Sequence, residues 1–497
     1  MKIKILKRAS AVMLCLTLAV SALCFAPSVS AAQVYDGEHL DVPQIRVVTE
    51  NGNGTTLQKE DDYVNAQITI KDTDGTELSD AVQFKVRGNT TALSWVTKKA
   101  FTFKFAKKKN VLGMGSGKKW FLLANAFDPT LLRNYTAFEL ARELGLEYTS
   151  NQKICELWVD GSFRGCYTLY EPVQEGKDRV NIDIESNGGK KDFLLEFEAV
   201  TEEDDVTYLV ADKRFRFAFK DPEEPTEEQQ AYVQEIMDDI VAAIKTGDKA
   251  QIEQKIDLPS FAKYYLLNEY LKTFDFERTS VYFYYKDGKL YAGPAWDYDL
   301  CAGNAYPDFS ARAKNAADYN GIFADKNLYI YLAKYGWFNE MVSEVYRDHY
   351  EFIENISADG GFLDTTYAQY KDVFERNYKE AGWNISKWWL NNYKKPLPTY
   401  AANYDYLKDW LDVRNDWMTV HFNPFGEDYK IGDVNGDKSI DVFDATLVQK
   451  YIVENAGLTG EQKIIADVNN DNTVDALDAT EIQKYSSDML SKFKRVI

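Results

Sequence analysis

The stretch Asp433-Val-Asn435-Gly-Asp437-Lys-Ser439-Ile-Asp441-Val-Phe-Asp444 decides the fold of the C-terminal end, and a second copy runs from Asp467 to Asp478. Oxygen-bearing side chains fall at loop positions 1, 3, 5, 9 and 12, and position 7 can offer its backbone carbonyl, as a hard cation such as Ca²⁺ requires. The spacing therefore predicts two Ca²⁺ sites. Their expected ligands are Asp433, Asn435, Asp437, Ser439, Asp441 and Asp444 in the first loop, and Asp467, Asn469, Asp471, Thr473, Asp475 and Asp478 in the second.

Both loops differ from an EF-hand loop. Position 12 is Asp instead of Glu, and position 6 is Lys438 or Asn472 instead of Gly. No entering helix is expected before the first loop, because Pro424 and Gly426 lie just upstream. A duplicated loop-then-helix unit of this kind resembles a dockerin. That resemblance implies a small all-α domain that binds a cohesin module on a cellulosome-type scaffold.

The N-terminus has the pattern of a secretory signal peptide, predicted over residues 1–31. Basic residues up to Arg8 precede an apolar run from Ala11 to Ala26, and Val29-Ser30-Ala31 offers small residues for cleavage. The run is too short for a convincing membrane span. We therefore expect an exported, extracellular protein without membrane insertion. The net charge of −20 also argues against nucleic acid as a partner.

The remaining sequence predicts a large domain at residues 32–425, joined by a short linker at 426–431 to the dockerin-like domain at 432–497. Alternating apolar and polar residues predict strands first, and helical periodicity follows later. This order is typical of an α+β fold. The expected elements are strands within 45–86, a hairpin at 155–170, helices at 226–244 and 259–273, and a mainly helical stretch at 327–422.

The cysteines of the hairpin leave two alternatives open. A two-residue turn at Asp160-Gly161 would place Cys155 opposite Cys166. A cross-strand disulfide is then geometrically possible, and two buried free thiols are equally compatible with the sequence.

Carboxylates are the most promising catalytic candidates in the large domain. Asp275 follows an expected helix, Asp297 and Asp299 follow an expected strand, and Asn304 comes after a Gly303 turn. Acidic groups on such loops could hold a divalent ion, with a further carboxylate as general base. They could equally cap turns or pair with basic side chains. Histidine-based chemistry is poorly supported, because the chain has three widely spaced histidines.

Spaced motifs between about residues 80 and 305 resemble the spore-coat protein H (CotH) kinase-like family. The motifs are Arg87-Gly88-Asn89, Lys98-Lys99 with Lys104, Lys119-Trp120, Asp128 with Arg133-Asn134, Leu157-Trp-Val-Asp-Gly, Tyr167-x-Leu-x-Glu171, Asp275, and Gly293-Pro-Ala-Trp-Asp297-Tyr-Asp299 with Asn304. The resemblance implies an atypical protein-kinase-like fold. It also implies transfer of the ATP γ-phosphate to Ser or Thr of a protein in the presence of Mg²⁺.

By the same resemblance, Asp275 is the expected base-like carboxylate and Asp297 the main Mg²⁺ ligand, supported by Asp299 and Asn304. Cations must neutralise the phosphates, and a carboxylate must orient the basic side chain that does so. The candidates for these two roles are Arg87 and Lys104, with Lys98 and Lys99 as competing lysines, and Glu171 as the orienting carboxylate and ion-pair partner.

Ser280 is a departure from the kinase pattern, since an Asn usually lies five residues after the catalytic Asp and binds a second metal ion. A hydroxyl is a weaker Mg²⁺ ligand than an amide carbonyl. A non-catalytic role as a structural or binding component of the scaffold is therefore an alternative. A third possibility is a polysaccharide-degrading enzyme, which would need two carboxylates flanking a glycan cleft. Glu196 and Glu198, on one face of an expected strand, are the candidates.

Overall fold

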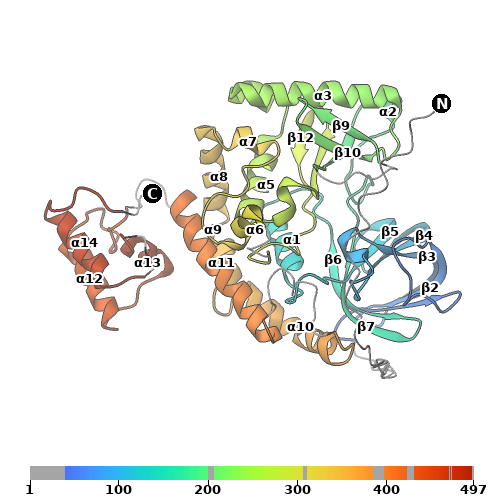
Figure 1. Cartoon of the computed structure of the whole chain (residues 1–497), viewed down its shortest axis with the longest axis horizontal. Coiled ribbons are helices and arrows are strands. Elements are labelled where there is room, and N and C mark those ends of the chain that lie inside the picture. The colour runs from blue at the N-terminus through green and yellow to red at the C-terminus, as the bar shows by residue number, and fades with distance from the viewer. Residues whose placement is uncertain are drawn as a thin grey trace, which may run out of the picture.

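The computed structural model describes residues 40–199, 206–305, 310–383, 397–422, 430–469, 471 and 473–494. The predicted signal peptide lies outside these ranges, as does most of the predicted linker. Strands prevail in the first half of the large domain and helices in the second, which confirms the α+β prediction (Figure 1). Within the described ranges, no helix combines the length and the apolar character needed to cross a bilayer.

A closed β-barrel forms the first part of the large domain. Its strands are hydrogen-bonded in the order β1-β2-β3-β4-β5-β7-β6, and β6 returns to β1 in parallel. Because side chains alternate along a strand, Phe84, Phe103 and Trp120 are buried inside the barrel while their neighbours point outward. The strands are β1 (Gln44–Thr49), β2 (Val64–Lys71), β3 (Glu77–Arg87), β4 (Ala100–Asn110), β5 (Ser116–Leu123), β6 (Gln152–Val159) and β7 (Ser162–Tyr170).

The predicted register of the β6–β7 hairpin is wrong by one residue. Leu157 pairs with Gly165 and Trp158 with Phe163, so Arg164 is an extra residue in β7. This β-bulge places Cys155 opposite Tyr167 instead of Cys166, and the two cysteines belong to different hydrophobic clusters. Both thiols are free and buried, and the disulfide alternative is therefore excluded.

An open antiparallel sheet in the order β12-β11-β8-β10-β9 follows the barrel. Helix α3 packs beside β9 and begins with a capping box formed by Thr226 and Gln229, and α5 packs beside β12. The elements of this part are α1 (Arg133–Glu143), α2 (Ser186–Gly189), β8 (Phe193–Phe197), β9 (Tyr208–Ala211), β10 (Phe215–Asp221), α3 (Glu227–Thr246), α4 (Lys249–Glu253), α5 (Leu258–Leu271), β11 (Val281–Lys286) and β12 (Lys289–Ala292).

Helices make up the rest of the large domain and enclose α5. The buried side chains of Arg414 and Glu269 form an ion pair at 2.5 Å that fastens α11 to α5. Neither charge is accessible to solvent. Removing one partner would leave the other charge buried without a counter-ion and would destabilise the fold. The helices are α6 (Ala311–Ala317), α7 (Tyr329–Leu332), α8 (Gly336–Asp348), α9 (Tyr350–Ser357), α10 (Phe362–Lys379) and α11 (Tyr400–Phe422).

The C-terminal module is a small helical unit with its own core. Figure 1 shows its helices beyond α11, away from the barrel, and α13 contacts α11. Val434, Val448 and Ile482 are buried between the helices, whereas Ile452 at the end of α12 is exposed. The helices are α12 (Val442–Ile452), α13 (Gly460–Ala466) and α14 (Ala476–Ser486).

Candidate functional site

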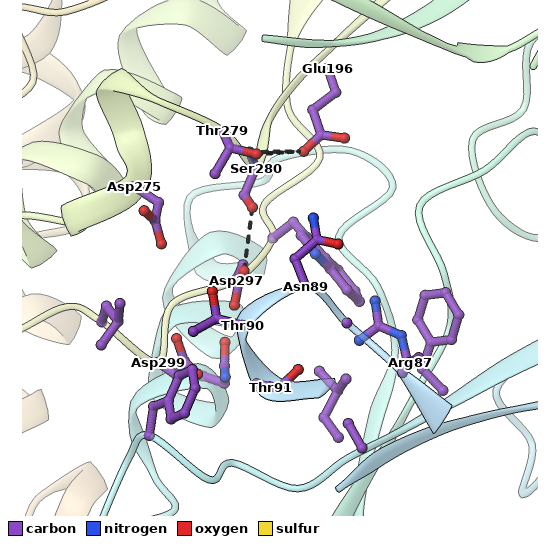
Figure 2. A pocket seen from close by; sticks show the side chains of 18 of the residues that line it. Arg87, Asn89, Thr90, Thr91, Glu196, Asp275, Thr279, Ser280, Asp297 and Asp299 are labelled. Atoms are coloured by element: carbon purple, nitrogen blue, oxygen red, sulfur yellow. Dashed lines mark hydrogen bonds between the residues drawn. The ribbon is translucent and has the colours of Figure 1, made fainter. Parts of the chain in front are cut away.

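A cleft of about 870 Å³ opens between the outer face of β3, β4 and β5 and the loops that follow α5 and β12. Figure 2 shows the carboxylates of Asp275, Asp297 and Asp299 gathered in one part of the cleft, while Arg87 approaches from the barrel. Segments distant in sequence therefore supply acidic groups on one side and basic groups on the other.

The acidic side is built by two short segments. Asp275 lies in the 3₁₀ turn η2 (Phe274–Glu277) directly after α5. Asp297 and Asp299 lie in the loop after β12, where Asp297 has a left-handed backbone with φ of 63°. Such a conformation is costly for a residue with a side chain and is often retained at functional sites. Here it accompanies the placement of the Asp297 carboxylate in the cleft.

The three carboxylates perturb one another. Burial raises the pKa of Asp275 to about 7, and the negative charge of Asp297 contributes further. Burial also raises the pKa of Asp299 well above its usual range, with added effects of Asp297 and Asp275. The pKa of Asp297 is raised by burial and lowered by the charge of Arg87. Like charges in one cleft favour a cation among them, and Asp275, Asp297 and Asp299 are therefore the candidate ligands of a hard divalent ion such as Mg²⁺.

Two polar side chains hold this acidic group in place. The Ser280 hydroxyl donates a hydrogen bond to Asp297 Oδ2 at 3.3 Å, so the residue at the usual Asn position does lie beside the expected metal ligand. The Asn304 amide nitrogen donates to the carbonyls of Asp299 at 2.6 Å and Phe127 at 2.8 Å. Asn304 therefore braces the loop that carries Asp299 while it also lines the cleft.

The basic side lies on the outer face of the barrel. The Arg87 guanidinium is 3.9 Å from the ring centre of Phe121 and faces the cleft beside Trp296. Lys119 projects from β5 into the same space. Burial lowers the pKa of Lys119, the nearby Glu223 raises it, and the positive charges of Lys220, Arg87 and Lys104 lower it further. Cations that repel one another in this way favour a bound anion.

The two acidic loops of the C-terminal module have a matching internal geometry. In the first loop, Asp444 is buried and accepts hydrogen bonds from the backbone N–H groups of Asn435 and Asp441 at 3.0 and 2.8 Å. In the second loop, Asp478 accepts from the N–H groups of Asn469 and Asp475 at 3.3 and 2.9 Å. Asp441 and Asp475 also N-cap α12 and α14, so each loop leads directly into its helix.

The donor atoms of these loops fit a calcium ion. Burial raises the pKa of Asp478 to about 6, and the neighbouring charges of Asp467 and Asp471 add to the shift. The buried Oδ1 atom of Asn469, at loop position 3, has no hydrogen-bond partner among the described residues. Crowded carboxylates beside an unpartnered amide oxygen are what a hard oxygen-binding cation would satisfy.

Comparison with protein families agrees with both halves of this description. The family profile described as CotH kinase protein matches residues 84–418, which is more than half of the chain. The chain belongs to the CotH kinase protein family. A second profile, Dockerin type I domain, matches residues 431–485, and dockerin type I domains bind calcium. None of the curated proteins compared with the chain matches it.

In this CotH-family chain, the expected lysines lie elsewhere. Lys104 is exposed on β4 and does not line the cleft, whereas its cross-strand partner Lys119 does. The Lys98 ammonium donates to the Cys166 carbonyl at 2.6 Å and to Asn377, and Lys99 donates to the Ala92 and Leu93 carbonyls. Both buried lysines therefore hold backbone in place. The family motif Lys119-Trp120 includes Lys119, but the sequence alone gave no reason to prefer Lys119 over Lys98, Lys99 or Lys104 as the lysine of the cleft.

Glu171 also lies outside the cleft of the CotH domain, and among the described residues it forms no ion pair with a lysine. Its Oε2 atom accepts hydrogen bonds from the Asn151 N–H at 3.0 Å and the Asn151 side-chain amide at 2.8 Å. Glu171 instead lines a separate cavity near Arg179. The Lys–Glu ion pair that does lie in the cleft joins Lys220 to Glu196 at 3.0 Å.

Glu196 and Glu198, the candidates for glycan cleavage, both line the cleft. The Thr279 hydroxyl lies 3.2 Å from Glu196 Oε1 (Figure 2) and 2.6 Å from Glu198 Oε2, and the Ser280 N–H donates to Glu196 at 2.9 Å. With the partly exposed Lys220, these contacts form a network of hydrogen bonds and an ion pair that joins β8 to the segment after Asp275. The arrangement favours a supporting role over a pair of catalytic acids separated by a substrate.

A loop that the sequence did not assign to the site also lines the cleft. Asn89, Thr90 and Thr91 follow β3 and line the cleft (Figure 2). Gly88 has φ of 100°, and a Cβ atom there would lie 2.0 Å from the Thr91 hydroxyl. The tight turn after Arg87 therefore depends on glycine. The sequence feature that could have indicated this loop is Gly88 followed by three polar residues, Asn89, Thr90 and Thr91.

Proposed function

We propose that the CotH domain is a protein kinase that transfers the ATP γ-phosphate to a Ser or Thr hydroxyl of a protein. The observation that carries this proposal is the meeting of three mutually perturbing carboxylates with Arg87 and Lys119 in one cleft. Phosphoryl transfer needs cations for phosphate charge, acidic ligands for Mg²⁺ and a carboxylate at the acceptor hydroxyl. The cleft has a candidate side chain for each of these roles.

The proposed roles follow from position and charge. Asp297 and Asp299 would hold Mg²⁺, which neutralises phosphate charge when bound. Arg87 and Lys119 would contact phosphate oxygens from the barrel side. Asp275, at the end of α5 and apart from the basic wall, would orient the acceptor hydroxyl and accept its proton.

Incubation with γ-labelled ATP, Mg²⁺ and candidate acceptor proteins tests this function. We expect label on Ser or Thr of an acceptor. Calorimetry with ATP and Mg²⁺ provides the second readout. Absence of nucleotide binding by the native protein would favour the non-catalytic alternative, a structural or binding component of an extracellular scaffold.

Replacing Lys119 with methionine should weaken ATP–Mg²⁺ binding by about tenfold to a hundredfold, because one charged hydrogen bond to phosphate is lost. Lys104→Met is the matched control, since Lys104 pairs with Lys119 across β4 and β5 yet lies outside the cleft. Calorimetric titration of both variants measures the effect. A larger loss of ATP–Mg²⁺ affinity in Lys104→Met than in Lys119→Met would contradict this assignment and identify Lys104 as the phosphate contact.

We further propose that the dockerin domain attaches the protein to a cohesin of an extracellular, cellulosome-type scaffold. The helices after the two loops carry exposed apolar residues where a partner can bind. Phe443 is 67% exposed and Leu477 is 60% exposed, and Val442 adds to the first face. Tyr485 in α14 contributes less to the second face, because it is partly buried against Phe493. Secretion through the predicted signal peptide is part of this proposal.

Phe443→Ala should weaken cohesin binding by about thirtyfold, as expected when an aromatic anchor is lost from an interface. Leu477→Ala should cost less, because the second repeat presents Ala476 and Leu477 where the first presents Val442 and Phe443. Surface plasmon resonance against a panel of cohesins compares the two variants. Equal losses would contradict the expected difference between the two faces.

A further inference from the structure

Asp297 lies at one end of a connected series of polar contacts. Its Oδ2 atom accepts a hydrogen bond from the Ser280 hydroxyl at 3.3 Å, and the Ser280 N–H donates to Glu196 Oε1 at 2.9 Å. The other oxygen of Glu196, Oε2, forms an ion pair with the Lys220 ammonium at 3.0 Å. All four residues line the cleft, so these contacts connect the candidate metal ligand to a cation on β10.

The two residues nearest the candidate metal site both have an unusual backbone. Ser280 and Asp297 each have φ of 63°, in the left-handed region that side chains disfavour. Ser280 directly precedes β11, and Asp297 lies in the loop after β12. Figure 2 shows the Ser280 hydroxyl directed at the Asp297 carboxylate between these two segments. Both costly conformations therefore accompany this one contact.

Glu196 holds Ser280 from the neighbouring strand. It lies on β8, where it pairs with Tyr282 of β11, two residues after Ser280. The Glu196 residue is 8% exposed. One of its carboxylate oxygens accepts from the Ser280 N–H, and the other contacts Lys220. Because both oxygens are engaged within the protein, Glu196 is suited to supporting a neighbour and less suited to binding a metal ion itself.

The contact between Ser280 and Asp297 has a direct consequence for metal binding. A hydrogen bond to one carboxylate oxygen restricts rotation of the group and therefore fixes the direction in which it can meet a cation. Carboxylates that bind metal ions are themselves commonly hydrogen-bonded, and loss of such a partner typically lowers metal affinity or activity by about tenfold to a hundredfold.

We propose that Ser280 and Glu196 are positioning residues for the divalent ion of the cleft. Ser280 orients the Asp297 carboxylate, Glu196 holds Ser280 in place, and Lys220 balances the charge of Glu196. This role rests on the proposed function, in which Asp297 is a metal ligand. It also gives Ser280 a different task from the Asn of the kinase pattern, because Ser280 donates to the metal ligand and is not required to be a ligand itself.

Titration of the full chain with Mn²⁺, with the free ion measured by electron paramagnetic resonance, tests the role of Ser280. Enough Ca²⁺ is present to fill the dockerin loops, and Asp297→Ala identifies the binding event that belongs to the cleft. Ser280→Gly should weaken this event by about tenfold to a hundredfold, because the hydroxyl is lost. Glycine adopts the left-handed backbone without strain, so the fold is retained.

Ser280→Ala should weaken Mn²⁺ binding at least as much as Ser280→Gly, since it also lacks the hydroxyl. The matched control is Ser94→Ala, which removes an exposed hydroxyl and should leave Mn²⁺ affinity unchanged. A loss confined to Ser280→Ala would show an effect of the backbone and not of the hydroxyl, and would overturn the proposal. So would unchanged affinity in Ser280→Gly, or the absence of any Mn²⁺ binding that Asp297→Ala removes.

Glu196→Ala and Glu196→Gln separate the hydrogen bond of Glu196 from its charge. Both variants lose the charge, but the amide oxygen of glutamine can still accept from the Ser280 N–H. We expect Mn²⁺ to bind about tenfold more weakly to Glu196→Ala than to Glu196→Gln. Equal affinities would overturn the role of Glu196. These titrations use neither nucleotide nor acceptor, so absence of phosphate transfer in a chain that shows the expected differences would contradict the kinase proposal alone.

Discussion

Replacement of Asp297 by alanine should abolish Mg²⁺-dependent nucleotide binding, with a loss of about a hundredfold or more in affinity. Asp297 lies between the other acidic residues and Arg87, and its charge influences both sides of the cleft. Without it, phosphate would lose the cation that joins it to the acidic side. Calorimetry with ATP in the presence and absence of Mg²⁺ measures the effect.

Asp275→Ala should have the opposite signature, with nucleotide binding nearly intact and phosphate transfer reduced by about 10²- to 10⁴-fold. Its proposed role is confined to the acceptor hydroxyl. A labelled-ATP assay on both variants separates binding from transfer. Asp348→Ala, at an exposed site on α8, is the control for loss of a carboxylate. Unchanged nucleotide affinity in Asp297→Ala would favour the non-catalytic alternative.

Removal of calcium should unfold the dockerin domain. Its apolar core is small, and Asp433, Asp444, Asp467 and Asp478 are buried within the loops. Without a cation, these carboxylates repel one another in a unit that is already marginal in size. At a calcium concentration of one hundred times Kd, each ion would contribute about 2.7 kcal/mol to stability.

Circular dichroism of residues 430–497 with EDTA and with Ca²⁺ measures this dependence, and we expect helical signal only with Ca²⁺. Asp444→Ala should raise the calcium concentration needed for folding, because it removes the position-12 carboxylate of the first loop. A surface control is Asp488→Asn, which removes an exposed carboxylate outside both loops with a residue that tolerates the left-handed backbone at this position. Identical, fully folded spectra in EDTA and in Ca²⁺ would contradict the prediction.

The sequence by itself determined the features that depend on local order. The calcium loops are contiguous, so the spacing of Asp433 to Asp444 places its oxygen groups without help from the rest of the chain. The α3 capping box was predictable for the same reason, since Thr226 and Gln229 meet within one helical turn. The order of strands and helices likewise gave the α+β class.

Only the tertiary structure decided which charged side chains share the cleft. The sequence gives no reason to prefer Lys104 or Lys119 as the phosphate contact. In the structure the two residues pair across β4 and β5, and Lys119 lines the cleft whereas Lys104 lies outside it. Glu171 follows β7 at a point beyond the cleft. Such placements depend on how strands pair across the barrel, which is a non-local property.

The β6–β7 hairpin shows that a shift of one residue in strand register separates the pairing expected from the sequence from the pairing in the tertiary structure. A bulge at Arg164 moves Cys155 and Cys166 to different hydrophobic clusters and replaces a possible disulfide with two buried thiols. Gly165 has φ of 81°, and a Cβ atom there would lie 2.5 Å from the Asn377 side chain on α10. Asn377 is far away in sequence, so the packing against α10 that accompanies the bulge could not be read from the hairpin residues alone.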